Sequence, residues 1–179
     1  GDTLHFTDGK GNLLIAEITN SDQRKTRVKL IDKIIQEKQH NYYLHIAIAP
    51  TKNMDRFEWF LEKATEIGID EITPIICEHS VRKKVKTERG NRILLSAMKQ
   101  SLKYHLPKLN EDISFKDFIK QDFEGNKYIA HCEEGKKIEL RKEKKEKRTL
   151  ILIGPEGDFS PAEIENSTTN NFTPISLGN

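Results

Sequence analysis

The sequence predicts an α/β fold, in which a parallel sheet carries helices on both faces and a short all-β segment precedes it. From residue 42 onward, short apolar runs alternate with amphipathic helical patterns, an order typical of βα units. Residues 150–153 contain no polar side chain, as expected of a strand buried on both faces. Residues 1–35 instead alternate apolar and polar side chains between Gly- and Asn-rich turns, which indicates antiparallel strands.

Residues 1–38 are expected to form the last part of a small β-barrel. Strands are predicted over 2–8 and 13–19, joined by the Gly-rich turn between them, and a third from residue 26. This segment is too short to be a domain by itself, and both ends of the chain resemble cuts rather than natural termini. We therefore expect a fragment, with a second domain over residues 42–179 after a polar linker.

The second domain is predicted to open with a strand over 42–49 and a helix over 54–67. Asn53 can cap this helix, and Gly68 is placed to end it. A strand over 71–77 and a helix over 89–106 follow, before Pro107. The remaining predicted elements are a short helix at 115–119, strands over 127–132, 150–153 and 173–177, and a helix from 161 to 166.

Composition excludes several classes of protein. No apolar run is long enough to cross a bilayer and no signal-peptide core is present, so we expect a cytoplasmic protein without a membrane partner. Cys77 and Cys132 are isolated in the sequence, which fits a reducing compartment and disfavours a disulfide or a metal site.

The formal charge of +2 is distributed unevenly. Residues 79–109 contain nine basic residues and one acidic residue, so this segment carries +8 and the remainder −6. Such a concentration is typical of a surface that binds a polyanion, although a solvated helical face would look similar. The basic run 136–148 is interspersed with glutamates and is interpreted as a self-paired, solvent-exposed segment.

A Gly-bracketed loop, Gly154-Pro155-Glu156-Gly157, follows the apolar run 150–153. Directly after it, Ser160 and Glu163 match a capping box with Pro161 at the first helical position. Such a strand-to-helix loop lies at the carboxyl ends of parallel strands, where ligands usually bind. A plain βα turn would use the same residues.

Six stretches of the sequence form a recognisable set: 51–58, 62–68, 78–82, 97–101, 153–160 and 175–179. Together they resemble the ribosomal RNA small-subunit methyltransferase E family of the knotted SPOUT methyltransferases. The resemblance covers essentially the whole chain, and residues 1–11 are similar to the end of that family's PUA-like N-terminal barrel.

That family methylates N3 of a uridine in 16S rRNA with S-adenosylmethionine, so the resemblance implies this activity and the small ribosomal subunit as partner. It also implies a trefoil knot, a homodimer and a cofactor held among three loops. The implied cofactor-binding residues are His131, Cys132, Glu133, Ile153, Gly154, Pro155, Glu156, Gly157, Ile175, Leu177, Gly178 and Asn179.

Two departures from the family pattern concern the site. The family often has a second glycine where this chain has Asp158, which is acceptable before a helix because a carboxylate favours the positive end of the helix dipole. The family's motif also continues past Asn179 into an Arg-rich turn thought to supply a functional arginine. The catalytic group is therefore left open, with Glu66 and Arg82 as candidates and a structural role favoured for Glu66.

Basic and amide side chains are expected to hold the RNA. Lysine and arginine neutralise phosphates without reading sequence, whereas a glutamine offers both a donor and an acceptor to a base edge. The candidates are Lys52, Arg56, Arg82, Lys83, Lys84, Gln100 and Lys103.

Several roles stay open from the sequence. Glu156 could complement the sulfonium or bond backbone N–H groups inside its turn, while His79 is interpreted as a loop residue and His45 as a core histidine. The alternatives to a 16S rRNA methyltransferase are an RNA-binding module without catalysis and a methyltransferase acting on another RNA such as tRNA. A phosphate-binding glycine loop is disfavoured because no Lys-Ser/Thr pair follows it.

Overall fold

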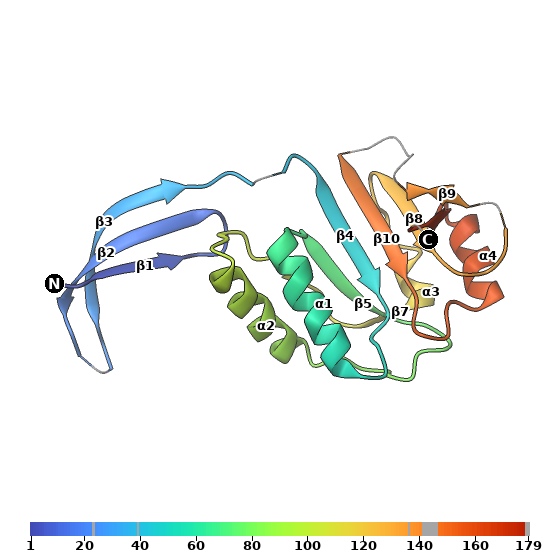
Figure 1. The fold of residues 1–179 in the computed structure, drawn as a ribbon, viewed down its shortest axis with the longest axis horizontal. Helices are drawn as coiled ribbons and strands as arrows, with labels where there is room; N and C mark the ends of the chain where they lie inside the picture. Colours follow the sequence, from blue (N-terminus) through green and yellow to red (C-terminus); the bar gives the residue numbers. More distant parts are fainter. Residues whose placement is uncertain (23, 39, 136, 141–146, 178–179) are drawn as a thin grey trace.

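The computed structural model describes residues 1–179 apart from 23, 39, 136, 141–146 and 178–179. It contains a small antiparallel sheet and a large parallel sheet (Figure 1). The small sheet has the order β1-β2-β3, formed by Thr3–Thr7, Asn12–Asn20 and Arg27–Ile35. It projects away from the rest of the molecule in Figure 1 and leaves apolar side chains such as Phe6, Leu30 and Ile35 exposed.

The large sheet has eight strands, and every pairing in it is parallel. Its order is β6-β5-β4-β10-β8-β11-β9, with β7 also pairing with β5. The predicted parallel sheet is thus confirmed. The strands are β4 (Tyr43–Ile48), β5 (Glu71–Ile76), β6 (Lys108–Leu109), β7 (Ile113–Ser114), β8 (Asn126–Ala130), β9 (Ile138–Glu139), β10 (Arg148–Ile153) and β11 (Thr173–Ser176).

Helices pack on both faces of this sheet because side chains alternate along its strands. Leu44, Ile46 and Ile48 of β4 pack with α1 (Met54–Ile67) and α2 (Thr87–Gln100). Ala47, on the other face, packs with α3 (Phe115–Phe118) and with Ile164 of α4 (Pro161–Thr169). None of the described helices has the length and apolar character needed to span a membrane.

The local signals at helix ends are confirmed. The Asn53 side chain accepts from the backbone N–H of Asp55, and Gly68 ends α1 in the left-handed conformation with φ of 114°. Ser160 and Glu163 form both hydrogen bonds of the capping box. The first turns of α1 and α4 therefore lie at the carboxyl ends of β4 and β10.

The predicted end of α2 is wrong: the helix stops at Gln100 instead of continuing to residue 106. Two residues after Gln100, Leu102 adopts a left-handed φ of 52°, a conformation with which the helix cannot continue. The chain then pairs with the small sheet, because Gly11 N–H donates to the carbonyl of Tyr104 and Leu106 N–H donates to that of Gly9. Tertiary pairing thus overrides the helical pattern. The two-residue strands β6, β7 and β9 were not predicted.

Candidate functional site

A cavity of about 460 Å³ lies at the carboxyl ends of β8, β10 and β11. Its volume falls in the range of small-molecule sites. The walls come from the ends of these strands, the loop after β8 and the loop between β10 and α4. The lining residues are Ala130, His131, Cys132, Lys137, Ile153, Gly154, Pro155, Glu156, Asp158, Ile175, Ser176 and Leu177.

The glycines of the β10–α4 loop are closely packed, so that a side chain at either position would require its neighbours to shift. A Cβ on Gly154 would lie 3.1 Å from the ring of Phe159, which is buried beneath the loop. A Cβ on Gly157 would lie 3.3 Å from Cβ of His79. The His79 ring Nδ1 donates to the Gly157 carbonyl at 3.0 Å, so this histidine supports the β10–α4 loop.

Asp158 links the loop after β8 to the loop between β10 and α4. Its Oδ2 accepts from the backbone N–H of Cys132 at 2.6 Å, and its Oδ1 accepts from Phe159 N–H at 2.8 Å. Its φ of 59° lies in the left-handed region, which glycine adopts freely and Asp or Asn tolerates. A glycine at this position would satisfy the backbone but could not tie the β8 loop to the β10 loop.

Glu156 bonds to the backbone of another loop. Its Oε1 accepts from Lys52 N–H at 2.9 Å, which links the β10–α4 loop to the loop after β4. Hydrogen bonds from backbone N–H groups, including that of Lys52, hold the pKa of Glu156 below its usual value. Of the two roles left open for this carboxylate, its contacts support the structural one.

His131 has two buried ring nitrogens without a hydrogen-bond partner among the described residues. Buried polar atoms are nearly always hydrogen-bonded, so an unpartnered pair in the wall of a cavity points to a bound molecule. Burial lowers the pKa of His131, and the Lys137 ammonium lowers it further, which favours the neutral ring. A neutral imidazole offers one donor and one acceptor.

Most of the residues proposed to bind the cofactor line this cavity. Glu133 and Gly157 do not line it: Glu133 lies exposed in the β8 loop, and Gly157 faces His79. Gly178 and Asn179 lie outside the described residues. The residues brought together are His131, Cys132, Ile153, Gly154, Pro155, Glu156, Ile175 and Leu177.

The lining residues that were missed from the sequence are Ala130, Lys137, Asp158 and Ser176. Lys137 reaches the site because β9, which it directly precedes, pairs with β11. Its Nζ donates to the carbonyl of His131 at 3.0 Å. The sequence offered only a mixed charge run around Lys137, in which no local pattern marks this lysine.

The RNA candidates form two groups at opposite ends of α2. Lys52, Arg56 and Arg82 lie at the carboxyl edge of the sheet, where Arg82 Nε donates to the carbonyl of Lys52 at 3.1 Å. Lys84 lies exposed before α2, and the Lys83 ammonium folds back onto the carbonyl of Cys77 at 3.2 Å.

Gln100 and Lys103 form the second group, beside the small sheet. Gln100 is the last residue of α2 and is exposed. Lys103 lines a cavity of about 100 Å³ together with Gly9 and His105, at the junction with the small sheet. A helix of 14 residues spans about 20 Å, so the two groups are separated by roughly that distance.

Glu66 and Arg82, the two catalytic candidates, lie far apart. Both oxygens of Glu66 accept from Lys63 Nζ at 3.0 Å, near the end of α1 that points away from the cavity. Arg82 is exposed at the same edge as the cavity. The positions thus support the structural role of Glu66 and leave Arg82 as the candidate near the cavity.

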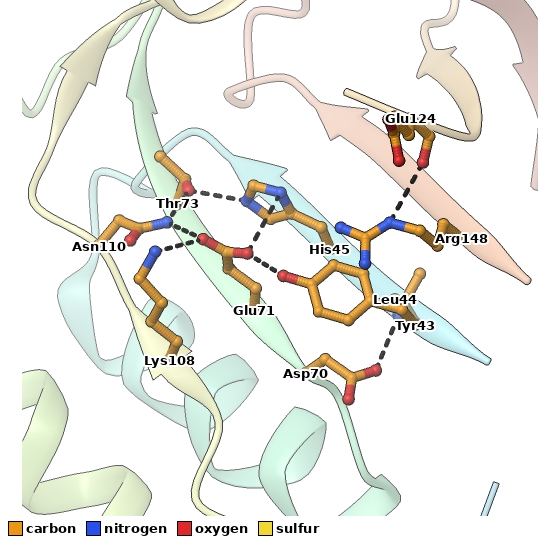
Figure 2. Close-up of polar contacts among 10 residues, drawn as sticks. All are labelled: Tyr43, Leu44, His45, Asp70, Glu71, Thr73, Lys108, Asn110, Glu124 and Arg148. Carbon is orange, nitrogen blue, oxygen red and sulfur yellow. Dashed lines mark hydrogen bonds and ion pairs between the residues drawn. The ribbon is translucent and has the colours of Figure 1, made fainter. Parts of the chain in front are cut away.

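A second polar cluster lies at the amino edge of the sheet (Figure 2). Glu71 accepts from Lys108 Nζ at 2.9 Å, from Asn110 Nδ2 at 2.7 Å and from the Tyr43 hydroxyl. His45 Nε2 bonds to the Thr73 hydroxyl at 2.8 Å. These contacts join β4, β5 and β6 at the edge opposite the 460 Å³ cavity.

Burial and hydrogen bonding set the charges of this cluster. Burial lowers the pKa of His45 to about 4, so the ring is neutral near pH 7, as expected of a core histidine. The hydrogen bonds from Asn110, Tyr43 and Lys108 outweigh burial and lower the pKa of Glu71 to about 2. The cluster is therefore a stabilising network around one carboxylate.

Comparison with known proteins assigns this chain to a class. The model of the RNA methyltransferase domain family matches residues 38–179, which include the whole parallel sheet and the cavity. The chain is therefore an RNA methyltransferase domain together with the small sheet that precedes it.

Within that class the chain belongs to the ribosomal RNA small subunit methyltransferase E family, as the sequence indicated. It is 30% identical over 172 residues to the protein of that name from Mesomycoplasma hyopneumoniae (strain 232), covering 92% of this chain and 72% of the relative. The protein of that name from Bacillus subtilis (strain 168) is 27% identical over 193 residues, covering 99% of this chain and 75% of the relative.

Solved structures agree with this assignment. A probable rRNA-methyltransferase from Porphyromonas gingivalis is 40% identical with a TM-score of 0.92, covering 100% of this chain and 77% of that one. A methyltransferase from Legionella pneumophila, solved with bound S-adenosylmethionine, is 25% identical with a TM-score of 0.87, covering 100% of this chain and 76% of that one.

Proposed function

We propose that this protein transfers a methyl group from S-adenosylmethionine to N3 of a uridine in the 16S rRNA of the small ribosomal subunit. The observation that carries the proposal is the cavity at the carboxyl ends of β8, β10 and β11, in a chain that belongs to this methyltransferase family. The relative from Legionella pneumophila, with the same fold, was solved with this cofactor.

The residues of the cavity fit the cofactor. Ile153, Ile175 and Leu177 offer apolar surface for an adenosine, and the unpartnered ring of neutral His131 offers a donor and an acceptor. Asp158 and Glu156 hold the loops together through backbone N–H groups, so the site is ordered before binding. When bound, the cofactor supplies an activated methyl group on a cationic sulfur.

Methylation at N3 also requires that the uridine lose its N3 proton. A positive charge beside the base stabilises the anion and favours this loss. We assign that role to Arg82, which lies at the carboxyl edge and is held there by the carbonyl of Lys52.

The RNA is held by the exposed basic residues at the carboxyl edge. Lys52, Arg56, Arg82 and Lys84 contact phosphates near the cavity, and Lys83 adds positive charge while supporting the end of β5. Gln100 and Lys103 contact a more distant part of the substrate beside the small sheet.

The same proposal extends to architecture. Residues 1–38 belong to a PUA-like barrel, which the exposed apolar side chains of the small sheet support. Residues 42–179 form a SPOUT domain with a trefoil knot. The strand order supports the knot, because β10 lies between β4 and β8 and the chain then passes β8 to reach β11. We further propose a cytoplasmic homodimer.

Two measurements test this function. Calorimetry should detect binding of S-adenosylmethionine by the full-length protein, and mass spectrometry should find N3-methyluridine in small subunits that lacked this modification. Absence of cofactor binding with retained RNA binding would leave only the RNA-binding module. Methylation of tRNA but not of small subunits would instead identify the other substrate.

A further inference from the structure

The charged groups in the 460 Å³ cavity are unequally available to a ligand. Both lining carboxylates are already hydrogen-bonded to backbone: Glu156 to Lys52 N–H, and Asp158 to Cys132 and Phe159 N–H. Among the described lining residues, Lys137 alone carries a positive charge, because burial favours the neutral form of His131.

Lys137 is held in place but keeps its capacity to donate. An ammonium has three N–H donors, and the one hydrogen bond described for Lys137 goes to the His131 carbonyl. Lys137 forms no ion pair with any residue that the structure describes. The charge therefore faces the cavity, and none of the described carboxylates forms an ion pair with it.

Resting on the function proposed above, we infer that Lys137 binds the carboxylate of the methionine part of S-adenosylmethionine. That carboxylate is the only anionic group of the cofactor, whose sulfonium and ammonium groups would be repelled by this lysine. A charge-assisted hydrogen bond to Lys137 would therefore fix which end of the cofactor enters beside the β8 loop. Lys137 is therefore a cofactor-orienting residue.

Cofactor analogues separate this role from a merely structural one. S-adenosylhomocysteine keeps the carboxylate, whereas 5′-methylthioadenosine keeps the adenosine and the thioether but lacks the whole amino-acid group. Lys137→Gln should weaken S-adenosylmethionine and S-adenosylhomocysteine about tenfold, the loss of one charge-assisted hydrogen bond. The same variant should bind 5′-methylthioadenosine with unchanged affinity. Calorimetry on the full-length protein gives all three constants.

Control variants make the result specific. Lys120→Gln removes the same charge from an exposed position outside the cavity and should leave all three affinities unchanged. Lys137→Arg should recover most of the affinity for the two ligands that carry a carboxylate. Melting temperatures of the variants should match that of the unchanged protein.

Two outcomes would overturn the inference. Equal weakening of all three ligands would mean that Lys137 acts only by supporting the His131 carbonyl. Unchanged affinity for S-adenosylmethionine in Lys137→Gln would mean that the carboxylate is bound elsewhere, while the proposed methyltransferase function would stand. Failure of the unchanged protein to bind S-adenosylmethionine would remove both proposals.

Discussion

Single residues decide whether the loops around the cavity act as one unit. Asp158 has a backbone conformation suited to glycine and a carboxylate that accepts from Cys132 N–H in the β8 loop and from Phe159 N–H just before α4. The sequence marked this position only as a departure from a family glycine. The positive φ explains why glycine suits this position, and the hydrogen bonds show what the aspartate adds in this chain.

Replacing Asp158 separates these two contributions. Asp158→Gly keeps an allowed backbone but loses the bond to Cys132 N–H, so we expect the affinity for S-adenosylmethionine to fall several-fold with a small change in stability. Asp158→Ala should lose about 1 kcal/mol more stability, since alanine is strained at φ of 59°. Calorimetry and urea unfolding measure the two effects. Unchanged affinity in Asp158→Gly would show that the two loops do not need this bond.

Titration of the amino-edge cluster should make stability depend on pH. The folded-state pKa of His45 is about 4, below its unfolded value near 6.5. The contribution of neutral His45 to the free energy of unfolding is therefore fully present above pH 6.5 and is lost as pH falls toward 4. Glu71, with a folded pKa of about 2, adds a loss below about pH 4.5. Urea unfolding should show stability declining by up to about 3 kcal/mol between pH 7 and 4 from His45.

A matched pair of variants tests whether His45 causes the loss of stability between pH 7 and 4. His45→Gln removes the titrating ring and should flatten the profile between pH 7 and 4, whereas His5→Gln, at an exposed position on the small sheet, should not. A decline that survives in His45→Gln would place the responsible proton elsewhere.

At the scale of elements, capping signals and apolar periodicity were reliable guides. Asn53, Gly68, Ser160 and Glu163 mark helix ends that local hydrogen bonds fix, and these were predicted. The end of α2 was not, because residues 104–106 pair with a sheet about 95 residues earlier in the chain. Pairing between distant segments also creates β6, β7 and β9, which are too short to leave a pattern.

The residues of the candidate site likewise include some that the sequence predicts and some that depend on pairing between distant segments. Gly154, Glu156 and Leu177 were found because they belong to motifs carried by a resemblance, and all three line the cavity. Lys137 was missed because its place depends on the pairing of β9 with β11, a contact that no local pattern encodes. The order of the strands was likewise beyond sequence reasoning, since any crossover connection satisfies the same periodicity.

The loop after β5 is expected to contribute most of the salt dependence of RNA binding near the cavity. Arg82→Gln with Lys84→Gln removes two exposed cations, so the slope of log affinity against log salt should decrease by about one to two units. Filter binding at several salt concentrations measures it. Lys116→Gln with Lys120→Gln, two exposed lysines around α3, is the control pair. Equal slopes in the two pairs would place the RNA elsewhere.

At the scale of the whole molecule, the small sheet is attached to the α2–β6 segment through a narrow contact. Gly11 has a φ of 95°, and a Cβ there would lie 2.6 Å from His105 Nε2 and 2.8 Å from the Gln36 carbonyl oxygen. This glycine allows the hairpin to approach the segment after α2 closely. The attachment is therefore sensitive to one methyl group.

Gly11→Ala should loosen this attachment without disturbing the cavity. We expect stability to fall by about 1 to 3 kcal/mol and methylation of ribosomal subunits to decrease, while affinity for S-adenosylmethionine is unchanged. A Cβ on Gly135, which also has a positive φ, would have no atom of the described residues within 4 Å, so comparing Gly135→Ala with Gly11→Ala separates steric clash from backbone strain. Weaker cofactor binding in Gly11→Ala would show that the two regions are coupled.

The antiparallel course of α2 against the sheet has a consequence for substrate size. Its first turn lies at the carboxyl edge of the sheet, the edge that also holds the cavity, and its last residue lies beside the small sheet, about 20 Å along a helix of 14 residues. A short oligonucleotide seated at the cavity would not reach Gln100 and Lys103. Efficient methylation should therefore begin only above a threshold RNA length, and below it the enzyme would be indifferent to changes at these two residues.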